Sequence, residues 1–151
     1  MAKLKDLCSK GSSNIAQKDL TDCEGLYPIY GAAGFIKNVD FYHQDKPYIA
    51  IVKDGAGVGR VMKLPANSSV IGTMQYIIPN EGVNVSYLAY ALEHMNLAKY
   101  YLGAAIPHIY FKDYCNEELP THTAEEQNNI ALSLDKVTEL IALRKEQLAK
   151  L

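Results

Sequence analysis

The chain has 151 residues, of which 48% are hydrophobic, and its formal net charge is −2 at pH 7. This length supports one hydrophobic core, and without a run of about 18 apolar residues the sequence predicts no membrane-spanning helix. The charge gives no overall basic footprint of the kind usual in nucleic-acid-binding proteins, so any DNA binding would depend on a local basic patch.

The N-terminal "MAKLKDLCSKGSS" carries lysines but no apolar core, so it does not read as a secretory signal. The three cysteines, Cys8, Cys23 and Cys115, are an odd number without CxxC spacing. We therefore expect reduced thiols and a cytoplasmic location. The four histidines are scattered along the chain, and we expect no metal site and no cofactor.

Residues 1–84 contain short β-prone runs separated by Gly, Pro, Asn and Asp, and no helical period runs through them. We predict a body of short strands joined by turns. The predicted strands lie within Leu26–Gly31, Pro47–Val52, Gly59–Leu64 and Gly72–Pro79.

The segment "YIAIVKDGAGVGRV", Tyr48–Val61, joins a β-branched run to a glycine-rich loop. One hypothesis is therefore a nucleotide-binding enzyme that uses the loop Gly55–Gly59. A dinucleotide fingerprint needs Gly-x-Gly-x-x-Gly followed by a helix. Here the spacing is Gly-x-Gly-x-Gly, and the strand-like "RVMKLP" follows. We interpret the loop as a wide β-turn whose backbone needs positive φ or approaches another group closely.

The same region is the most basic part of the chain. Between Lys46 and Lys63 it also contains Lys53 and Arg60, against Asp54 alone. Backbone N–H groups and flanking cations at one loop suit a phosphate backbone. Lys53, Arg60 and Lys63 are thus candidates for phosphate contacts, and a solvated surface is the alternative for each.

The pattern changes to a helical one in "NVSYLAYALEHMNLAKYYLG". We predict a helix of about four turns that is capped by Ser86 and ended by Gly103. Pro107 then prevents a helix, and "HIYF" predicts a short strand. His108 is expected to be a structural or contact residue, since no carboxylate or cysteine is spaced to assist it.

The last segment predicts a long helix from Ala124 to Leu151, with a capping box at Thr123 and Glu126. Such a helix would be about 42 Å long and would project from a body about 30 Å across. Apolar residues at alternating spacings of four and three predict a coiled-coil seam, although a long amphipathic helix on its own core is the alternative. The seam residues are Ile130, Leu134, Val137, Ile141, Arg144, Leu148 and Leu151. Arg144 within the seam could fix its register or meet a carboxylate such as Glu139 across the interface.

Motifs for catalysis are missing from the sequence. It has no Gly-x-Ser-x-Gly, no His-Glu-x-x-His and no paired carboxylates in an apolar context. Residue chemistry therefore favours a binding module over an enzyme.

Four motifs in order resemble one protein family. They are "YPIYGAAGFI", "PYIAIVKDGAGVGRV", "GAAIPHIYFKDY" and "LPTHTAEEQNNIALSLDKVTELIALRKEQL". Together they resemble the specificity subunit of type I restriction-modification enzymes, as one target recognition domain plus one spacer helix. The resemblance implies an α+β fold, with a β-rich, β-helix-like recognition domain over residues 1–120 and a long coiled-coil helix over 121–151.

The resemblance also implies a function. Subunits of that family have no catalysis of their own, read a bipartite double-stranded DNA site, and dock methyltransferase (modification) and restriction subunits on two antiparallel helices. This chain has one recognition domain, one helix and no internal repeat. A half-subunit that homodimerises, a fragment and an unexpressed exchange cassette are the open alternatives. A dimer would read a two-fold symmetric, interrupted site.

Base readout needs polar or flat side chains that reach the DNA grooves. The candidates, chosen by residue type and by their place near loop or strand ends, are Tyr30, Lys37, Asn38, Thr73, Gln75 and Lys112. A third hypothesis is a coiled-coil adaptor or inhibitor that binds a partner subunit through residues 124–151 and does not contact DNA.

Overall fold

The computed structural model describes residues 1–103 and 105–151. The strands are β1 (Ala2–Lys3), β2 (Cys8–Ser12), β3 (Tyr27–Gly31), β4 (Gly34–Val39), β5 (Tyr48–Val52), β6 (Val61–Leu64), β7 (Ser69–Val70), β8 (Met74–Pro79) and β9 (Glu118–Leu119). The α-helices are α1 (Val85–Met95), α2 (Phe111–Tyr114) and α3 (Ala124–Ala149). Short 3-10 helices are η1 (Leu4–Asp6), η2 (Gln17–Leu20) and η3 (Leu97–Tyr100). The four predicted β-prone runs contain β3, β5, β6 and β8, so those predictions are confirmed.

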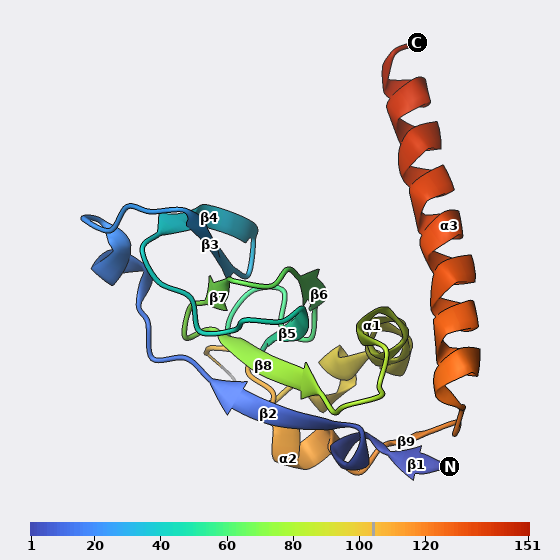
Figure 1. Cartoon of the computed structure of the whole chain (residues 1–151). Helices are drawn as coiled ribbons and strands as arrows, with labels where there is room; N and C mark the ends of the chain where they lie inside the picture. The colour runs from blue at the N-terminus through green and yellow to red at the C-terminus, as the bar shows by residue number, and fades with distance from the viewer. Residues whose placement is uncertain (104) are drawn as a thin grey trace.

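The strands form three sheets, and the long helix stands beside them (Figure 1). The largest sheet has the order β2-β8-β5-β6 with antiparallel pairs throughout. A second sheet has the order β4-β3-β7, and β1 pairs with β9. The β-helix-like part of the predicted fold is not confirmed. A β-helix stacks parallel strands, whereas among the described strands only β3 and β7 pair in parallel. The fold combines small β-sheets and helices with a long C-terminal helix.

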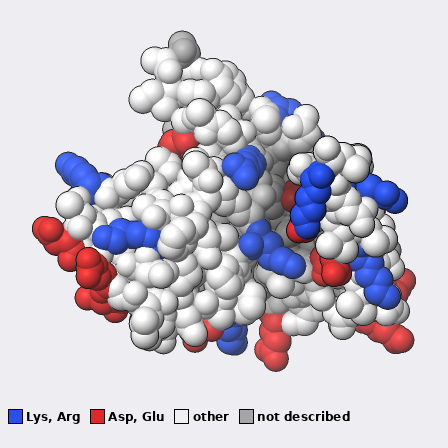
Figure 2. All heavy atoms as spheres, turned by 90° about the horizontal axis from the view of Figure 1, so that it is seen from above, with Lys and Arg blue, Asp and Glu red and all other residues white. Residues whose placement is uncertain are grey.

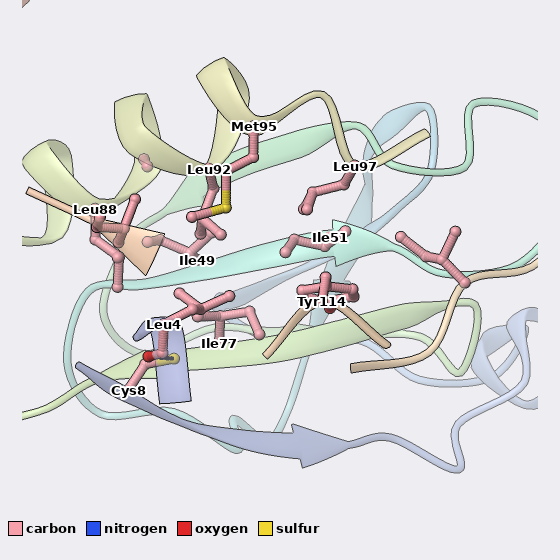
Figure 3. Close-up of a cluster of buried hydrophobic side chains, with 13 residues drawn as sticks. Leu4, Cys8, Ile49, Ile51, Ile77, Leu88, Leu92, Met95, Leu97 and Tyr114 are labelled. Carbon is pink, nitrogen blue, oxygen red and sulfur yellow. Dashed lines mark hydrogen bonds between the residues drawn. The ribbon is translucent and has the colours of Figure 1, made fainter. Parts of the chain in front are cut away.

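Strand β5 organises the core because both of its faces are covered. Ile49 and Ile51 point into a cluster with Leu88 and Leu92 of α1 (Figure 3). Successive strand residues point to opposite faces. Tyr48, Ala50 and Val52 therefore join a different cluster, which includes Val70, Met74 and Tyr76. Each large side chain buried in this way contributes about 1.5–3 kcal/mol of transfer free energy, which fixes the body around this strand.

Helix α1 begins and ends differently from the prediction. Asn84, not Ser86, is the N-cap, and its side-chain oxygen accepts a hydrogen bond from the backbone of Tyr87 at 2.9 Å. The helix ends at Asn96, which adopts the left-handed conformation with φ +53°. Asn tolerates that conformation better than most residues. The predicted stop at Gly103 is thus wrong.

The predicted strand "HIYF" is also wrong. His108 makes isolated bridges with Asp54 and Leu102, and helix α2 starts at Phe111. Pro107 does keep its own segment out of a helix, as expected.

The capping box of α3 is confirmed. Thr123 Oγ1 accepts from the backbone of Glu126 at 3.1 Å, and Glu126 Oε1 accepts from the backbone of Thr123 at 2.9 Å. These backbone and side-chain hydrogen bonds with Thr123 lower the pKa of Glu126. The cap fixes the start of a helix that runs past α1 and out of the body (Figure 1).

Helix α1 covers one side of α3 near its base. Gln127 and Ala131 are the buried residues of α3. The Tyr90 hydroxyl donates to Asp135 at 2.7 Å and lies 3.0 Å from the hydroxyl of Thr138. These contacts hold α3 against the body through a side that is not the predicted seam. Neither α3 nor any other helix in the described ranges is long and apolar enough to cross a membrane.

Candidate nucleic-acid interface

The glycine-rich loop joins β5 to β6 as an antiparallel hairpin, so no helix follows it. Gly59 donates to the carbonyl of Val52 at 2.8 Å, and Val52 donates to Arg60 at 3.0 Å. Gly55, Gly57 and Gly59 have φ values of +86°, +83° and +93°. The interpretation as a wide turn that needs positive φ is confirmed, and the loop lacks the strand-to-helix geometry of a dinucleotide site.

Gly59 also permits a close approach between two segments. A Cβ at Gly59 would lie 2.6 Å from the backbone nitrogen of Ala98, whereas a Cβ at Gly57 would meet nothing within 4 Å. We expect Gly59→Ala to lower the free energy of unfolding by about 3 kcal/mol, because it adds a backbone clash to the cost of positive φ. Gly57→Ala is the matched control, with an expected cost of about 1 kcal/mol. Urea denaturation of both variants checks this, and equal costs would contradict the close approach.

Three of the predicted DNA-binding residues lie together in one groove of about 380 Å³, beside the glycine-rich loop. We call it the cationic groove, and its lining residues are Lys10, Ser12, Lys53, Asp54, Gln75, Ile109, Tyr110, Phe111 and Lys112. Lys53 follows β5, Gln75 lies on β8, and Lys112 lies on α2. The backbone of Ile109 donates to the carbonyl of Lys53 at 2.9 Å, which brings the distant α2 segment to the end of β5.

The groove carries a local positive charge in a chain of net charge −2. Lys10, Lys53 and Lys112 line it against one acidic residue, Asp54. Among the described residues, no carboxylate lies within 4.0 Å of any of these three ammonium groups. Lys112 Nζ instead lies 5.2 Å from the centre of the Tyr110 ring. Over the face shown in Figure 2, by contrast, basic and acidic side chains are interspersed.

Gln75 has a structural bond within the groove wall. Its side chain is buried, and Nε2 donates to the carbonyl of Gly11 on the neighbouring strand β2. The amide nitrogen is therefore engaged by the protein.

A second hollow of about 580 Å³ adjoins the cationic groove, since Asp54 lines both. It is lined by Gln17, the β3–β4 turn Gly31–Ile36, the loop residues Asp54–Ala56, Ile71 and Thr73. Thr73 Oγ1 is buried there, and no hydrogen-bond partner for it lies within the part of the chain that the structure describes. The predicted residue Thr73 therefore lines the second hollow and not the cationic groove.

Tyr30 packs beside the second hollow, with its ring centre 6.2 Å from that of Phe35. Burial raises the pKa of the Tyr30 hydroxyl, which therefore stays neutral at physiological pH and can both donate and accept. Phe35 is 59% exposed on the same turn. The turn thus presents the exposed ring of Phe35 next to the hydroxyl-bearing ring of Tyr30.

The remaining predicted residues lie outside the cationic groove. Lys37 donates to the carbonyl of Leu20 at 2.8 Å, and Lys63 donates to Ser86 Oγ at 2.7 Å. Arg60 donates to the carbonyl of Ala32 at 3.2 Å and lines a separate hollow formed with the end of α1. Asn38 is exposed on β4. The structure therefore divides the candidates, and their contact with DNA stays a prediction.

Sequence reasoning missed Lys10 and Tyr110. Lys10 lies on β2, whose sequence "CSKGS" has no strong strand pattern, and it reaches the groove only because β2 pairs with β8. Tyr110 lies within the predicted strand "HIYF" and could have been found from its position two residues before Lys112.

The predicted seam of α3 faces solvent. Leu134, Val137, Ile141 and Leu148 are between 38% and 60% exposed, and Leu151 is fully exposed. Ile130 is half-buried, Arg144 is exposed, and Ile130 and Leu134 also line a groove of about 980 Å³ between α1 and α3. An apolar stripe of this length is unusual on the surface of a monomer.

Residues 1–151 match the family described as "Type I restriction modification DNA specificity domain". The chain belongs to this family. The resemblance inferred from the four sequence motifs is thereby confirmed. No curated protein matches the chain significantly in sequence.

Solved structures share the fold of this specificity domain. The S subunit of the type I restriction-modification system from M. genitalium has a TM-score of 0.74 and 20% identity, with 91% of this chain and 38% of that chain covered. A chain from a study of complex assembly and conformational transition of the type I R-M system has a TM-score of 0.77 and 18% identity, with 99% of this chain and 40% of that chain covered. The HsdS subunit from Thermoanaerobacter tengcongensis has a TM-score of 0.70 and 17% identity, with 97% of this chain and 39% of that chain covered. The specificity domain thus spans about two fifths of these chains.

In the described part of the specificity domain, no group of three or more His, Cys, Asp or Glu residues could hold a metal ion. Cys8, Cys23 and Cys115 are free thiols, and burial raises the pKa of Cys8 to about 12, with a smaller effect of the nearby Cys115. Cys8 is therefore an inert core residue at physiological pH.

Proposed function

We propose that this chain is a half specificity subunit of a type I restriction-modification system. It recognises double-stranded DNA through a recognition body, residues 1–120. It pairs with a second copy through a helix, residues 121–151. The single observation that supports this best is family membership over residues 1–151.

The DNA contact is proposed to lie in the cationic groove and the adjoining hollow. Three lysines line the groove, none with a carboxylate within 4.0 Å in the described part of the chain, and we propose that they contact phosphate oxygens. Tyr30, beside the second hollow, and Tyr110, in the groove wall, are proposed to contact base edges. Phosphate contacts position the duplex, and these neighbouring groups then read it.

The chain supplies no catalysis in this proposal. It directs methyltransferase and restriction subunits to a bipartite site, and the two copies read its two halves. A symmetric dimer mirrors its symmetry in the DNA, so the two half-sites would be inverted repeats of one another.

Co-expression with the methyltransferase subunit of the same system tests the proposal. We expect methylation of host DNA at one interrupted, two-fold symmetric sequence, which methylation-sensitive sequencing will identify. Methylation that is absent, or that shows no sequence selectivity, would contradict the function as a specificity subunit.

A further inference from the structure

A short hairpin beside the cationic groove carries apolar side chains that the proposed function does not use. Leu102 donates to the carbonyl of His108 at 2.9 Å, and His108 donates back to Leu102 at 2.8 Å. Gly103 has φ +103°, and a Cβ there would collide with the carbonyl of Ile106. These features hold Leu102–Gly103 and Ile106–His108 together, and we call these two stretches the hairpin; Ala104, between them, lies outside the described residues.

The hairpin exposes large apolar groups. Ile106 is 65% exposed and Leu102 is 50% exposed, while Tyr101 and Tyr110 flank the hairpin and are each nearly half exposed. By contrast, Ile109, directly after the hairpin, is buried in the main core. The apolar side chains are therefore presented outward from a firmly packed base.

Backbone hydrogen bonds fix the hairpin to the glycine-rich loop. The backbone of Gly55 donates to the carbonyl of Pro107 at 2.8 Å, and Ile109 donates to Lys53 at 2.9 Å. Asp54 and His108 form a β-bridge between the same segments. The stretch Pro107–Ile109 is therefore held in place before a ligand meets the neighbouring Ile106, which removes a cost of binding.

The charges next to the hairpin indicate what it meets. Its base runs into the cationic groove, where Ile109 and Tyr110 line the wall together with Lys53 and Lys112. A protein partner with a mainly apolar surface would leave these ammonium groups desolvated. A nucleic acid satisfies both features, because its phosphates pair with lysines and its base steps accept apolar side chains.

We propose that the hairpin acts as a wedge that inserts Ile106 between two adjacent base pairs of the bound duplex. The lysines of the cationic groove hold the phosphates beside it. Insertion partly unstacks one step and bends the DNA, so the deformability of that step contributes to site selection. This inference rests on the proposed function and adds a means of recognition to it.

Base-unstacking fluorescence tests the wedge. The probe is a duplex that carries the methylation site mapped above, with 2-aminopurine placed at successive positions, and the protein is the full chain in complex with its methyltransferase. We expect a rise in fluorescence confined to one step. Ile106→Ala should reduce that rise at least about twofold and weaken DNA binding by about tenfold, whereas Ile106→Phe should retain both.

Leu26→Ala is the matched control, since Leu26 is an exposed apolar residue just before β3 and outside the hairpin. An unchanged 2-aminopurine signal in Ile106→Ala, with site-selective methylation intact, would overturn the wedge and leave the proposed function standing. Loss of methyltransferase binding in Ile106→Ala, measured by mass, would assign the hairpin to a protein contact and also overturn the wedge. If the unaltered chain directs no site-selective methylation, the proposed function fails and the wedge fails with it.

Discussion

The double variant Val137→Asp/Ile141→Asp is expected to be a monomer under conditions where the unaltered chain has twice the mass of one chain. Both side chains are 51% exposed on the seam of α3. In a coiled coil they would be buried against a second helix, and unpaired carboxylates there would have to be desolvated. We expect the dissociation constant of the dimer to rise at least about 100-fold. Sedimentation equilibrium at several concentrations measures it.

Leu132→Asp provides the control on the same helix. Leu132 is 60% exposed and lies two residues from both Ile130 and Leu134, which places it about 200° around the helix from those seam residues. This variant makes the same change of chemistry and should leave the dimer intact. Equal effects of the two variants, or a monomeric unaltered chain, would contradict a homodimer through the seam and favour a fragment or a different helical partner.

Reversal of two charges in the cationic groove, Lys53→Glu/Lys112→Glu, is expected to lower DNA affinity about 100-fold near 0.1 M salt. The dependence of binding on salt should also become less steep by about two released counterions. The structure selects this pair because both lysines line one groove, whereas Arg60 lines another. Fluorescence anisotropy over a series of salt concentrations, with the methyltransferase complex, gives both quantities.

Lys46→Glu is the control for net charge. Lys46 lies just before β5 and Lys53 just after it, so the control changes the charge at the opposite end of the same strand. It should alter affinity by less than about threefold, because a distant charge is screened by salt. If the groove variant binds DNA as well as the control while dimerisation is intact, the adaptor hypothesis is favoured over DNA recognition by this surface.

The parts of the fold that follow from local pattern were predictable. The apolar run around β5 and the capping box at Thr123 and Glu126 have strong local signals, and both elements form where they were expected. Helix α1 was predicted to run on to Gly103, because a sequence pattern does not reveal that Asn96 adopts a left-handed conformation. The β-helix-like arrangement was not confirmed, since strand pairing is set by contacts between distant segments.

The sequence predicted some residues of the candidate site but not how they come together, because local patterns do not encode contacts between distant segments. Lys53 was found from the local excess of basic residues, and Lys112 from its residue type. Their presence in one groove depends on the hydrogen bond from Ile109 to Lys53, which no local pattern encodes. Lys37 and Lys63 look equally suitable in the sequence, but each donates to a protein oxygen. Residue type alone cannot separate a lysine that is free for a ligand from one that braces the fold.

The pairing of β1 with β9 has a consequence for how the chain folds. Ala2 lies opposite Leu119, so the first strand of the body finds its partner only after nearly the whole body has been synthesised. Contacts of such long sequence separation slow folding, because the chain must close a large loop before they form. Helix α3 comes after β9, so its seam residues emerge after the body. We therefore expect the body to become complete on the ribosome at about the time when the assembly helix appears, which limits premature pairing of unfinished chains.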